Sequence, residues 1–394
     1  MIKREIFFMA CILTLTSACG KKTNGDTTTS GSLLSITDVQ QSRDNSAITT
    51  FHFVINVENP SANEIKVDYA TVDGTANDND YTQKSSTLTI PANQNTAGID
   101  IEVKGDSLRE SPLIFYVQLS NPVDAKIYGN GKGTGTIICD GTYLPVNDSG
   151  YVAPTNYPGL SLKWSDEFND TAIDNNTWNY DIGGNGWGNN ELEYYTNSTK
   201  NSFITHGGYL VLEARQEAMG SNNYTSARLL TMNKQQFNYG RIDVRAILPK
   251  GQGIWPAIWM LGSDISTTPW PACGEIDMME LLGQQPGEIY GTMHFADASS
   301  QQAQLGGNYT MPSGDFSQKF HVFSIEWDST KIEWYVDGNK YFTGNISDVT
   351  GNNPFDKPFF FILNIAVGGN WPGSPDNTTV FPQRMIVDYV RVYQ

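Results

Sequence analysis

The 394-residue sequence has few positively charged side chains, and this shortage excludes one class of partner. Only 25 lysines and arginines stand against 42 aspartates and glutamates, so the net charge is -17. Binding to phosphate chains depends on Lys and Arg, and an acidic protein repels other polyanions. We therefore expect a neutral partner and no nucleic acid.

Cysteine is also scarce, with four residues in the whole chain. Cys11 and Cys19 lie near the N-terminus, and Cys139 and Cys273 fall in what we predict to be different domains. Disulfide frameworks need more cysteines at closer spacing. We expect Cys139 and Cys273 to be two inert thiols.

Long apolar runs are absent except at the N-terminus, where residues 6–15 follow a basic start and precede small residues. A membrane-spanning helix needs about 20 apolar residues, so this run is too short and instead has the order of a secretory signal. Residues 15–20 resemble a bacterial lipobox, although Thr16 replaces its usual leucine. The resemblance implies cleavage before Cys19 and lipidation of that cysteine.

Several acyl chains on one cysteine give stable anchoring, whereas a single chain does not. We therefore expect an exported bacterial lipoprotein at the outer membrane or cell surface, with residues 1–18 as the signal peptide and 19–32 as a polar tether. Ordinary secretion with a chance cysteine near the cleavage point is the alternative. The abrupt polar tether argues against it.

Helical apolar periodicity is lacking as well, while period-two alternation recurs along the chain, so we predict an all-β protein. The length exceeds what one core usually serves, which favours two domains. Residues 51–57, 99–103 and 113–119 alternate at a spacing typical of a β-sandwich. Residues 141–157, rich in Gly, Pro, Asn and Asp, form the expected linker between domains at 33–140 and 158–394.

The first domain resembles Calx-β domains in residues 67–76 and 106–110, which implies a Greek-key β-sandwich. Such domains often bind calcium, which takes 6 to 8 oxygen ligands. The candidate ligands here are Asp80, Asp106, Glu110 and Asp140. Leu113 stands where the family has a second glutamate, so we favour a structural spacer over a calcium site.

The second domain carries three carboxylates, Glu275, Asp277 and Glu280, in one short stretch. On a regular strand Glu275 and Asp277 share a face, whereas Glu280 turns to the opposite face with Ile276. A β-bulge around residues 278–279 resets this parity. We predict such a bulge, with all three carboxylates along one wall of a cleft.

This stretch resembles the Glu-x-Asp-x-x-Glu signature of glycoside hydrolase family 16 in its laminarinase-like form. The resemblance covers about residues 157–394 and includes residues 164–168, 186–192, 224–228, 255–260 and 364–373. It implies a β-jelly-roll sandwich with an open cleft and endo-acting hydrolysis of β-1,3-glucan or mixed β-1,3/1,4-glucan. It also implies Glu275 as nucleophile, Glu280 as acid and then base, and Asp277 as the group that orients the nucleophile.

With a bulge, the Cα atoms of Glu275 and Glu280 lie about 13 Å apart. Their side chains can then lean over Asp277 toward the carboxyl separation of roughly 5 to 5.5 Å that retaining glycosidases use. Inverting enzymes need a wider gap for water. We predict retention of anomeric configuration.

Indole rings pack well on the C–H faces of sugars. By the resemblance, the substrate-binding residues are Trp255, Trp259, Trp270, Trp371, His294, Asn189 and Arg228. For Trp259 the alternation with apolar neighbours leaves core and cleft equally open. His294 matches the family histidine beside the acid/base.

The resemblance further implies a structural calcium ion away from the cleft, held by Glu167, the backbone near Gly208, and Asp388. Such an ion stabilises the fold, and no cofactor is expected for catalysis. Two unrelated surface acids are the alternative. In the last strand, Ile386, Val390 and Val392 are expected to share one face.

Two other functions stay open. A non-catalytic β-glucan-binding lectin should lack one of the three carboxylates, all of which are present here. An agarase or carrageenase of the same family is the other alternative, but the net charge disfavours sulfated chains and residues 270–274 resemble laminarinases more. We expect a monomer.

Overall fold

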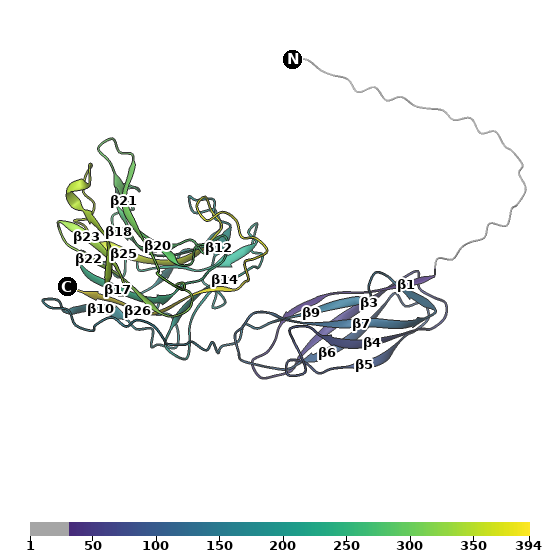
Figure 1. Cartoon of the computed structure of the whole chain (residues 1–394). Helices are drawn as coiled ribbons and strands as arrows, with labels where there is room; N and C mark the ends of the chain where they lie inside the picture. Colours follow the sequence, from purple (N-terminus) through teal and green to yellow (C-terminus); the bar gives the residue numbers. More distant parts are fainter. Residues whose placement is uncertain (1–30) are drawn as a thin grey trace, which may run out of the picture.

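The computed structural model describes residues 31–394, which form two β-sandwiches in succession along the chain (Figure 1). The signal-peptide and lipidation predictions, including Cys19, lie outside these residues. Within them, no helix is long and apolar enough to cross a membrane, and the one helix is the 3-10 turn η1 (Ile346–Asp348). The predicted all-β fold is confirmed.

The N-terminal sandwich packs a 4-stranded sheet, ordered β6-β3-β1-β8, against a 5-stranded sheet, ordered β2-β9-β7-β4-β5. Alternate residues of β3, among them Phe51, Phe53 and Ile55, are fully buried between the sheets, as their period-two pattern predicts. The strands are β1 (Ser32–Ile36), β2 (Val39–Ser42), β3 (Thr49–Glu58), β4 (Ile65–Asp73), β5 (Ser85–Ile90), β6 (Thr96–Val103), β7 (Leu113–Val123), β8 (Ala125–Ile127) and β9 (Lys132–Ile138).

The C-terminal sandwich packs two larger sheets around one continuous core. The 8-stranded sheet runs β13-β14-β26-β17-β22-β23-β24, with β10 paired to β26. Its strands are β10 (Leu162–Asp166), β13 (Ser202–Ile204), β14 (Leu210–Ala214), β17 (Gly240–Ile247), β22 (His321–Trp327), β23 (Lys331–Val336), β24 (Asn339–Asn345) and β26 (Gln383–Tyr393).

The 7-stranded sheet runs β11-β16-β25-β18-β19-β20-β21 and carries the site described below. Its strands are β11 (Asn179–Tyr180), β16 (Arg228–Leu230), β18 (Ile254–Gly262), β19 (Glu275–Leu281), β20 (Glu288–Ala296), β21 (Gln302–Thr310) and β25 (Phe359–Val367). A small parallel pair, β12 (Glu193–Tyr195) and β15 (Tyr224–Ser226), lies apart from both sheets.

The prediction for the last strand was wrong in one position. In β26, Arg245 pairs with Tyr389 and Ala246 pairs with Val387, so Asp388 is bulged out of the ladder. The bulge reverses the side-chain parity, because one extra residue turns every following side chain to the other face. Val387, rather than Ile386, therefore shares the buried core with Val390 and Val392.

Cys139 and Cys273 are both free and buried, in agreement with the prediction of inert thiols. Burial raises the pKa of each thiol to about 11. A thiol that stays protonated at neutral pH is a poor nucleophile.

The two sandwiches are joined through Arg109, whose side chain is 5% exposed. Its Nε donates to Glu213 of the second domain at 3.2 Å, and its guanidinium lies over the Phe203 ring, 4.1 Å from the centroid. Glu213 is fully buried and also accepts from Arg215 and Arg384. A buried carboxylate of this kind depends on its charged partners.

The linker is fastened to the second domain as well. Asp148 pairs with Arg245 at 2.5 Å, and the Arg245 guanidinium also donates to the backbone carbonyls of Asp148 and Tyr151. Arg245 is itself 2% exposed. These contacts hold the linker against the C-terminal sandwich.

We expect Arg109→Met to weaken the junction by about 2 kcal/mol, because a hydrogen bond to a charged group contributes roughly 1.5–3 kcal/mol and Glu213 keeps two other arginines. Differential scanning calorimetry should show a lower first transition that separates from the second. Lys66→Met, at an exposed ion pair with Glu64, is the matched control and should leave the trace unchanged. Equal traces for both variants would show that Arg109 does not couple the domains.

Candidate active site

A bulge in β19 brings the three predicted carboxylates to one face. Ile258 pairs with Met279 and Trp259 pairs with Asp277, so Met278 has no partner on the neighbouring strand. The register between β19 and its other neighbour, β20, also shifts between Asp277 and Glu280. The predicted bulge is confirmed, and it turns the methionines into the core while the carboxylates face outward.

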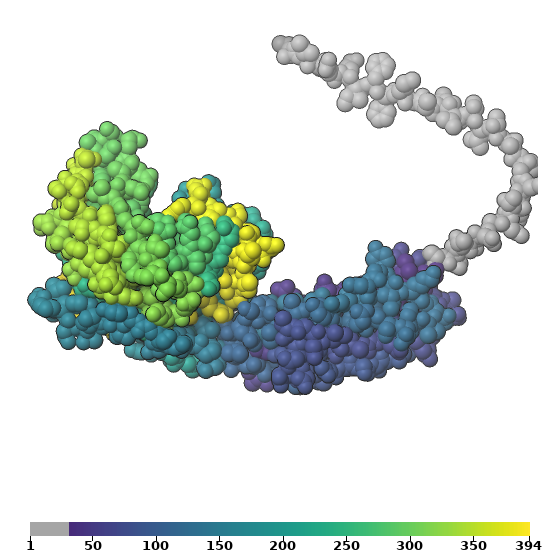
Figure 2. All heavy atoms as spheres, in the orientation of Figure 1, coloured from purple at the N-terminus to yellow at the C-terminus, as the bar shows by residue number. Residues whose placement is uncertain are grey.

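The carboxylates line a cleft of about 790 Å³ on the face of the 7-stranded sheet that is turned away from the core. Figure 2 shows the domain hollowed between its green and yellow surfaces. All seven residues predicted to bind substrate line this cleft: Trp255, Trp259, Trp270, Trp371, His294, Asn189 and Arg228. Sequence reasoning missed other lining residues, among them Trp187, Glu191, Tyr290, Gln302, Gln304 and Asn364.

Each of the two outer glutamates receives a hydrogen bond from an indole N–H. Trp270 donates to Oε2 of Glu275 at 3.0 Å, and Trp255 donates to Oε1 of Glu280 at 3.1 Å. Trp270 remains 43% exposed and therefore keeps a ring face free for a sugar. The sequence indicated only stacking for these rings, so their role in holding the carboxylates is a finding of the structure.

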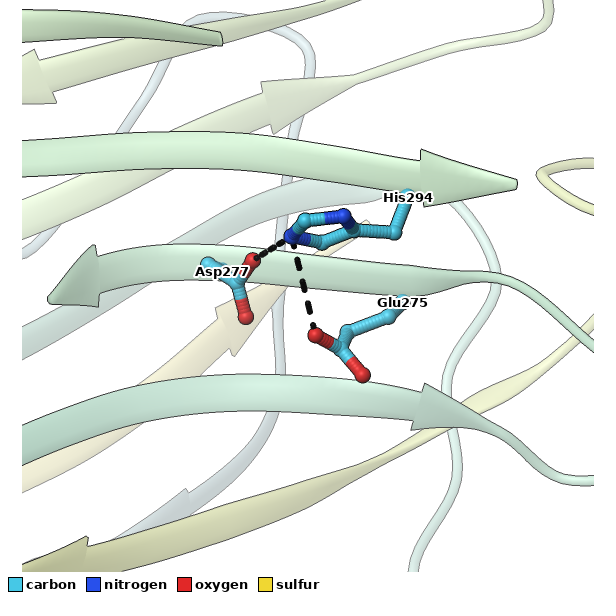
Figure 3. A group of neighbouring side chains, drawn as sticks. All are labelled: Glu275, Asp277 and His294. Carbon is cyan, nitrogen blue, oxygen red and sulfur yellow. Dashed lines mark ion pairs between the residues drawn. The ribbon is translucent and has the colours of Figure 1, made fainter. Parts of the chain in front are cut away.

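His294 lies beside Asp277 and Glu275 (Figure 3). Its Nε2 is 3.1 Å from Oδ2 of Asp277 and 3.8 Å from Oε1 of Glu275, and β20 places it directly opposite Glu275 in register. Gln302 lies on the other side of the imidazole, 3.4 Å from Nδ1. His294 thus lies beside the predicted nucleophile, and its charge also lowers the pKa of the predicted acid/base Glu280.

The ligand atoms of Glu275, Asp277 and His294 lie within 4.8 Å of one another, which is the only group of this kind among residues 31–394. Such a cluster has the donor types of a metal site. Its place at the centre of a sugar-sized cleft, with Trp270 bonded to Glu275, fits proton and carboxylate chemistry as well. The expectation that catalysis needs no metal stays a prediction.

Burial in this cluster favours the protonated forms of all three acids. Burial and then the charge of Asp277 raise the pKa of Glu275 to about 8, although His294 and Trp270 oppose the rise. Burial raises the pKa of Asp277 to about 8, and burial with both neighbouring charges raises that of Glu280 well above its ordinary value. Glu280 meets two carboxylates and Glu275 only one, so Glu280 should keep its proton to higher pH.

The two indole bonds predict that each substitution shifts a different limb of the pH–activity profile. Trp270→Phe removes a hydrogen bond that lowers the pKa of Glu275, so that pKa rises and the acidic limb moves to higher pH. Trp255→Phe acts in the same way on Glu280 and moves the alkaline limb to higher pH. A hydrogen bond to a charged group corresponds to a shift of about one pH unit. Profiles of kcat/KM in which both variants move the same limb would contradict these assignments.

The carboxylates proposed for calcium in the first domain surround an arginine. The Arg43 side chain, 1% exposed, lies 3.3 Å from Asp80, 3.3 Å from Asp106 and 3.0 Å from Glu110. Asp140 instead accepts from Ser42. Calcium at this place stays the untested alternative to a structural spacer, and it requires the guanidinium to leave.

The second predicted calcium site is also occupied by arginines. Arg391 forms two hydrogen bonds with Glu167, at 2.8 Å and 2.7 Å, and Arg245 donates to Asp388 at 2.7 Å. Gly208 is held separately by a hydrogen bond from its N–H to the Thr205 carbonyl. The structure thus gives each acid a cationic partner, and calcium there stays a prediction as well.

A cleft with three neighbouring carboxyl groups and several indole rings is the equipment of a glycoside hydrolase, which uses two carboxyl groups to cleave the glycosidic bond. Comparison with known families agrees. Residues 190–391 match Glycosyl hydrolases family 16, and residues 35–141 match the Calx-beta domain. The chain belongs to glycosyl hydrolase family 16.

Matches to similar proteins each cover 60% of this chain. It is 43% identical over 248 residues to the beta-glucanase of Rhodothermus marinus, a match spanning 60% of this chain and 86% of that protein. It is 41% identical over 260 residues to glucan endo-1,3-beta-glucosidase A1 of Niallia circulans, but that match spans only 38% of the relative. The laminarinase catalytic domain of Thermotoga maritima has a TM-score of 0.55 and 48% identity over 60% of this chain and 98% of that domain.

Proposed function

We propose that the chain is an endo-acting hydrolase that cleaves β-1,3-glucan, or mixed β-1,3/1,4-glucan, with retention. The observation that carries this proposal is the bulge in β19, which places Glu275, Asp277 and Glu280 together in one cleft under indole rings. The printed activities of the relatives support the choice of glucan: beta-glucanase, glucan endo-1,3-beta-glucosidase and laminarinase.

In the first step, Glu275 attacks the anomeric carbon from the face opposite the glycosidic oxygen. The bond to that oxygen breaks, and Glu280 gives its proton to the leaving chain. In the second step, the ionised Glu280 takes a proton from water, whose oxygen attacks the anomeric carbon and frees Glu275. Two inversions give net retention.

His294 and Asp277 act on the nucleophile. The Asp277 carboxyl lies 3.1 Å from His294, and His294 lies 3.8 Å from Glu275. Both residues therefore change the electrostatic environment of the Glu275 carboxyl. A protonated imidazole favours the carboxylate form of Glu275, and a negative Asp277 disfavours it. The pair therefore tunes the nucleophile between its two states.

The stereochemical prediction is tested on the first product. We expect proton NMR of laminarin hydrolysis to show the β-anomer first, with the α-anomer appearing later by mutarotation, because the carboxylates act by double displacement. An α-anomer that appears first would overturn the retaining mechanism.

The substrate is tested by the release of reducing ends from laminarin, lichenan and agarose side by side. Activity on laminarin and lichenan but not on agarose is the expected result. Activity on agarose alone would favour the agarase alternative, and binding without cleavage of any glucan would favour the lectin alternative.

We further propose that Cys19 carries a lipid that places the cleft outside the membrane, at the outer membrane or cell surface. The support is the lipobox-like sequence at residues 15–20 and the polar residues after it. Cys19→Ser should move the protein from the detergent phase to the aqueous phase in a partitioning assay. Unchanged partitioning would refute the anchor.

A further inference from the structure

At one half of the cleft lie two buried glutamates that the mechanism does not use, one in the cleft lining and one behind it. Glu191 is 8% exposed and Glu193 is fully buried. Glu193 begins β12, and Glu191 precedes it in the loop that also carries Asn189. A buried carboxyl group is costly for the fold unless its hydrogen bonds are satisfied. Both glutamates therefore need hydrogen-bond partners in the fold.

Glu191 is the last acceptor of a chain of hydrogen bonds that starts in the cleft. Trp259 donates from Nε1 to Oδ1 of Asn364 at 2.8 Å. Asn364 donates from Nδ2 to the Tyr195 hydroxyl at 3.1 Å, and that hydroxyl donates to Oε2 of Glu191 at 3.2 Å. Asn189 donates to the other oxygen, Oε1, at 3.3 Å. Two cleft residues, Trp259 and Asn189, are thus tied to one carboxyl group.

The direction of every bond in this chain follows from the indole N–H of Trp259 at one end and leads to Glu191 at the other. An indole N–H can only donate, so Trp259 requires the amide oxygen of Asn364. The Asn364 amino group then faces Tyr195, whose hydroxyl proton must point to Glu191. The Glu191 carboxyl thus accepts on both oxygens, from Tyr195 and from Asn189, and an ionised carboxylate is the stronger acceptor for both.

Glu193 holds the neighbouring turn in place. Its Oε2 accepts from the backbone N–H of Val367 at 2.6 Å, and the Val367 carbonyl accepts from the N–H of Leu192 at 2.7 Å. Val367 ends β25, and the turn that follows leads to Trp371 at the cleft. The Asn370 N–H in that turn donates to the Asn189 carbonyl at 2.8 Å.

We infer that Glu191 is a positioning residue for substrate binding, and that it fixes the orientation of Trp259 and Asn189 as the common acceptor of their hydrogen-bond chains. Glu193 supports it by holding the adjoining turn through Val367. The sugar units affected lie over the β25 side of the catalytic strand, where Trp259, Asn189 and Arg228 line the cleft.

The electrostatics agree with this division. Burial and then the nearby Glu191 raise the pKa of Glu193 well above its ordinary value, which favours its neutral form. Burial also raises the pKa of Glu191, but a hydrogen bond with Glu193, and then Asn189, Arg228 and Tyr195, favour its ionised form. The glutamate whose ionised form is the more favoured is therefore the one that accepts from Tyr195 and Asn189.

The test is Glu191→Gln in the full chain, assayed on laminarin. A glutamine has one oxygen, so Tyr195 or Asn189 must lose its acceptor and the orientation of Trp259 or Asn189 is released. We expect KM to rise about tenfold while kcat changes less than threefold, because the missing bonds act on sugar binding and not on the carboxyls that react. Tyr195→Phe, which breaks the same chain, should raise KM in the same way.

Two other variants separate positioning from general effects on the fold. Glu333→Gln removes a carboxyl that is 6% exposed on β23 of the other sheet, so it controls for the loss of a buried acid. Glu193→Gln keeps an acceptor for Val367 and should raise KM less than Glu191→Gln does. Melting temperatures, measured for all variants, identify any variant that fails to fold.

This inference rests on the proposed function, and the two can fail separately. No hydrolysis of laminarin by the unsubstituted protein would refute the proposed function. With that activity present, an unchanged KM in folded Glu191→Gln, or a rise no larger than in Glu333→Gln, would overturn the positioning role. A fall in kcat at constant KM would overturn it as well, since that result places Glu191 in the chemical step.

Discussion

Glu275→Ala should reduce the hydrolysis of laminarin to the background of the assay. Without the carboxylate no covalent glycosyl-enzyme forms, and neither Asp277 nor Glu280 can replace it. Asp277 is 3% exposed and engaged with His294, and Glu280 is held by Trp255 two residues beyond the bulge at Met278. The expected loss therefore exceeds that of any other single substitution.

Azide provides the sharper measurement for this variant. The anion fits the space left by the carboxylate and attacks the anomeric carbon from the same face, so an α-glycosyl azide should form from an activated β-aryl glucoside. The unsubstituted protein should give no such product. A β-glycosyl azide, or no rescue in a protein with unchanged melting temperature, would contradict the role of Glu275.

Stability measurements on the same variant check the electrostatics. In the folded protein the pKa of Glu275 is raised to about 8, above the ordinary value of 4.5. Between these values the unfolded chain has released the proton that the folded protein keeps, so this group lowers the free energy of unfolding as pH rises through that window. Glu275→Ala should therefore gain more stability at pH 8 than at pH 4, relative to the unsubstituted protein.

The bulge at Met278 could be predicted because the proposed reaction needs both glutamates on the same face of the strand. Glu275 and Glu280 are five residues apart, and regular alternation would have buried one of them. The bulge at Asp388 could not be predicted in this way, because no functional residue fixes which face of β26 is buried. The residues next to Asp388 are apolar on both faces of the strand. Parity errors of this kind are invisible to a pattern of apolar residues alone.

The sequence predicted which residues reach the cleft but not how they are oriented. Motif matches identified Trp255 and Trp270 as ring faces, whereas their N–H bonds to the glutamates depend on side-chain rotation in three dimensions. The chain from Trp259 to Glu191 includes a hydrogen bond between Asn364 and Tyr195, which are 169 positions apart. No local spacing rule links such residues.

The arginine partners of the predicted calcium ligands could not be foreseen from the sequence. Asp80, Asp106 and Glu110 suggested a cation, and the structure provides one from the chain itself, since Arg43 lies 37 residues before Asp80. Acid clusters in a sequence do not reveal whether the neutralising charge is a metal or a guanidinium. The same holds for Glu167, which is paired with Arg391 from 224 residues away.

Glu280→Gln is the second substitution with a large expected effect, a fall in kcat on laminarin of about 10² to 10⁴. The amide cannot give a proton to the leaving chain. The side chain keeps its shape and an oxygen for the Trp255 N–H, so the cleft should stay intact. The loss is then one of proton transfer and not of folding.

The leaving group distinguishes the acid from the nucleophile. A 2,4-dinitrophenyl glucoside needs no proton to depart, so Glu280→Gln should form the glycosyl-enzyme from it nearly as fast as the unsubstituted protein does. Breakdown of that intermediate still needs a base, and a burst of dinitrophenolate followed by slow turnover should result. Glu275→Ala should give no burst with the same substrate.

An equal loss on laminarin and on the aryl glucoside, with no burst, would show that Glu280 acts in some way other than as the acid and base. With a burst present, added azide should speed the second phase and give a β-glycosyl azide, since the anion attacks the intermediate from the face that Glu280 serves.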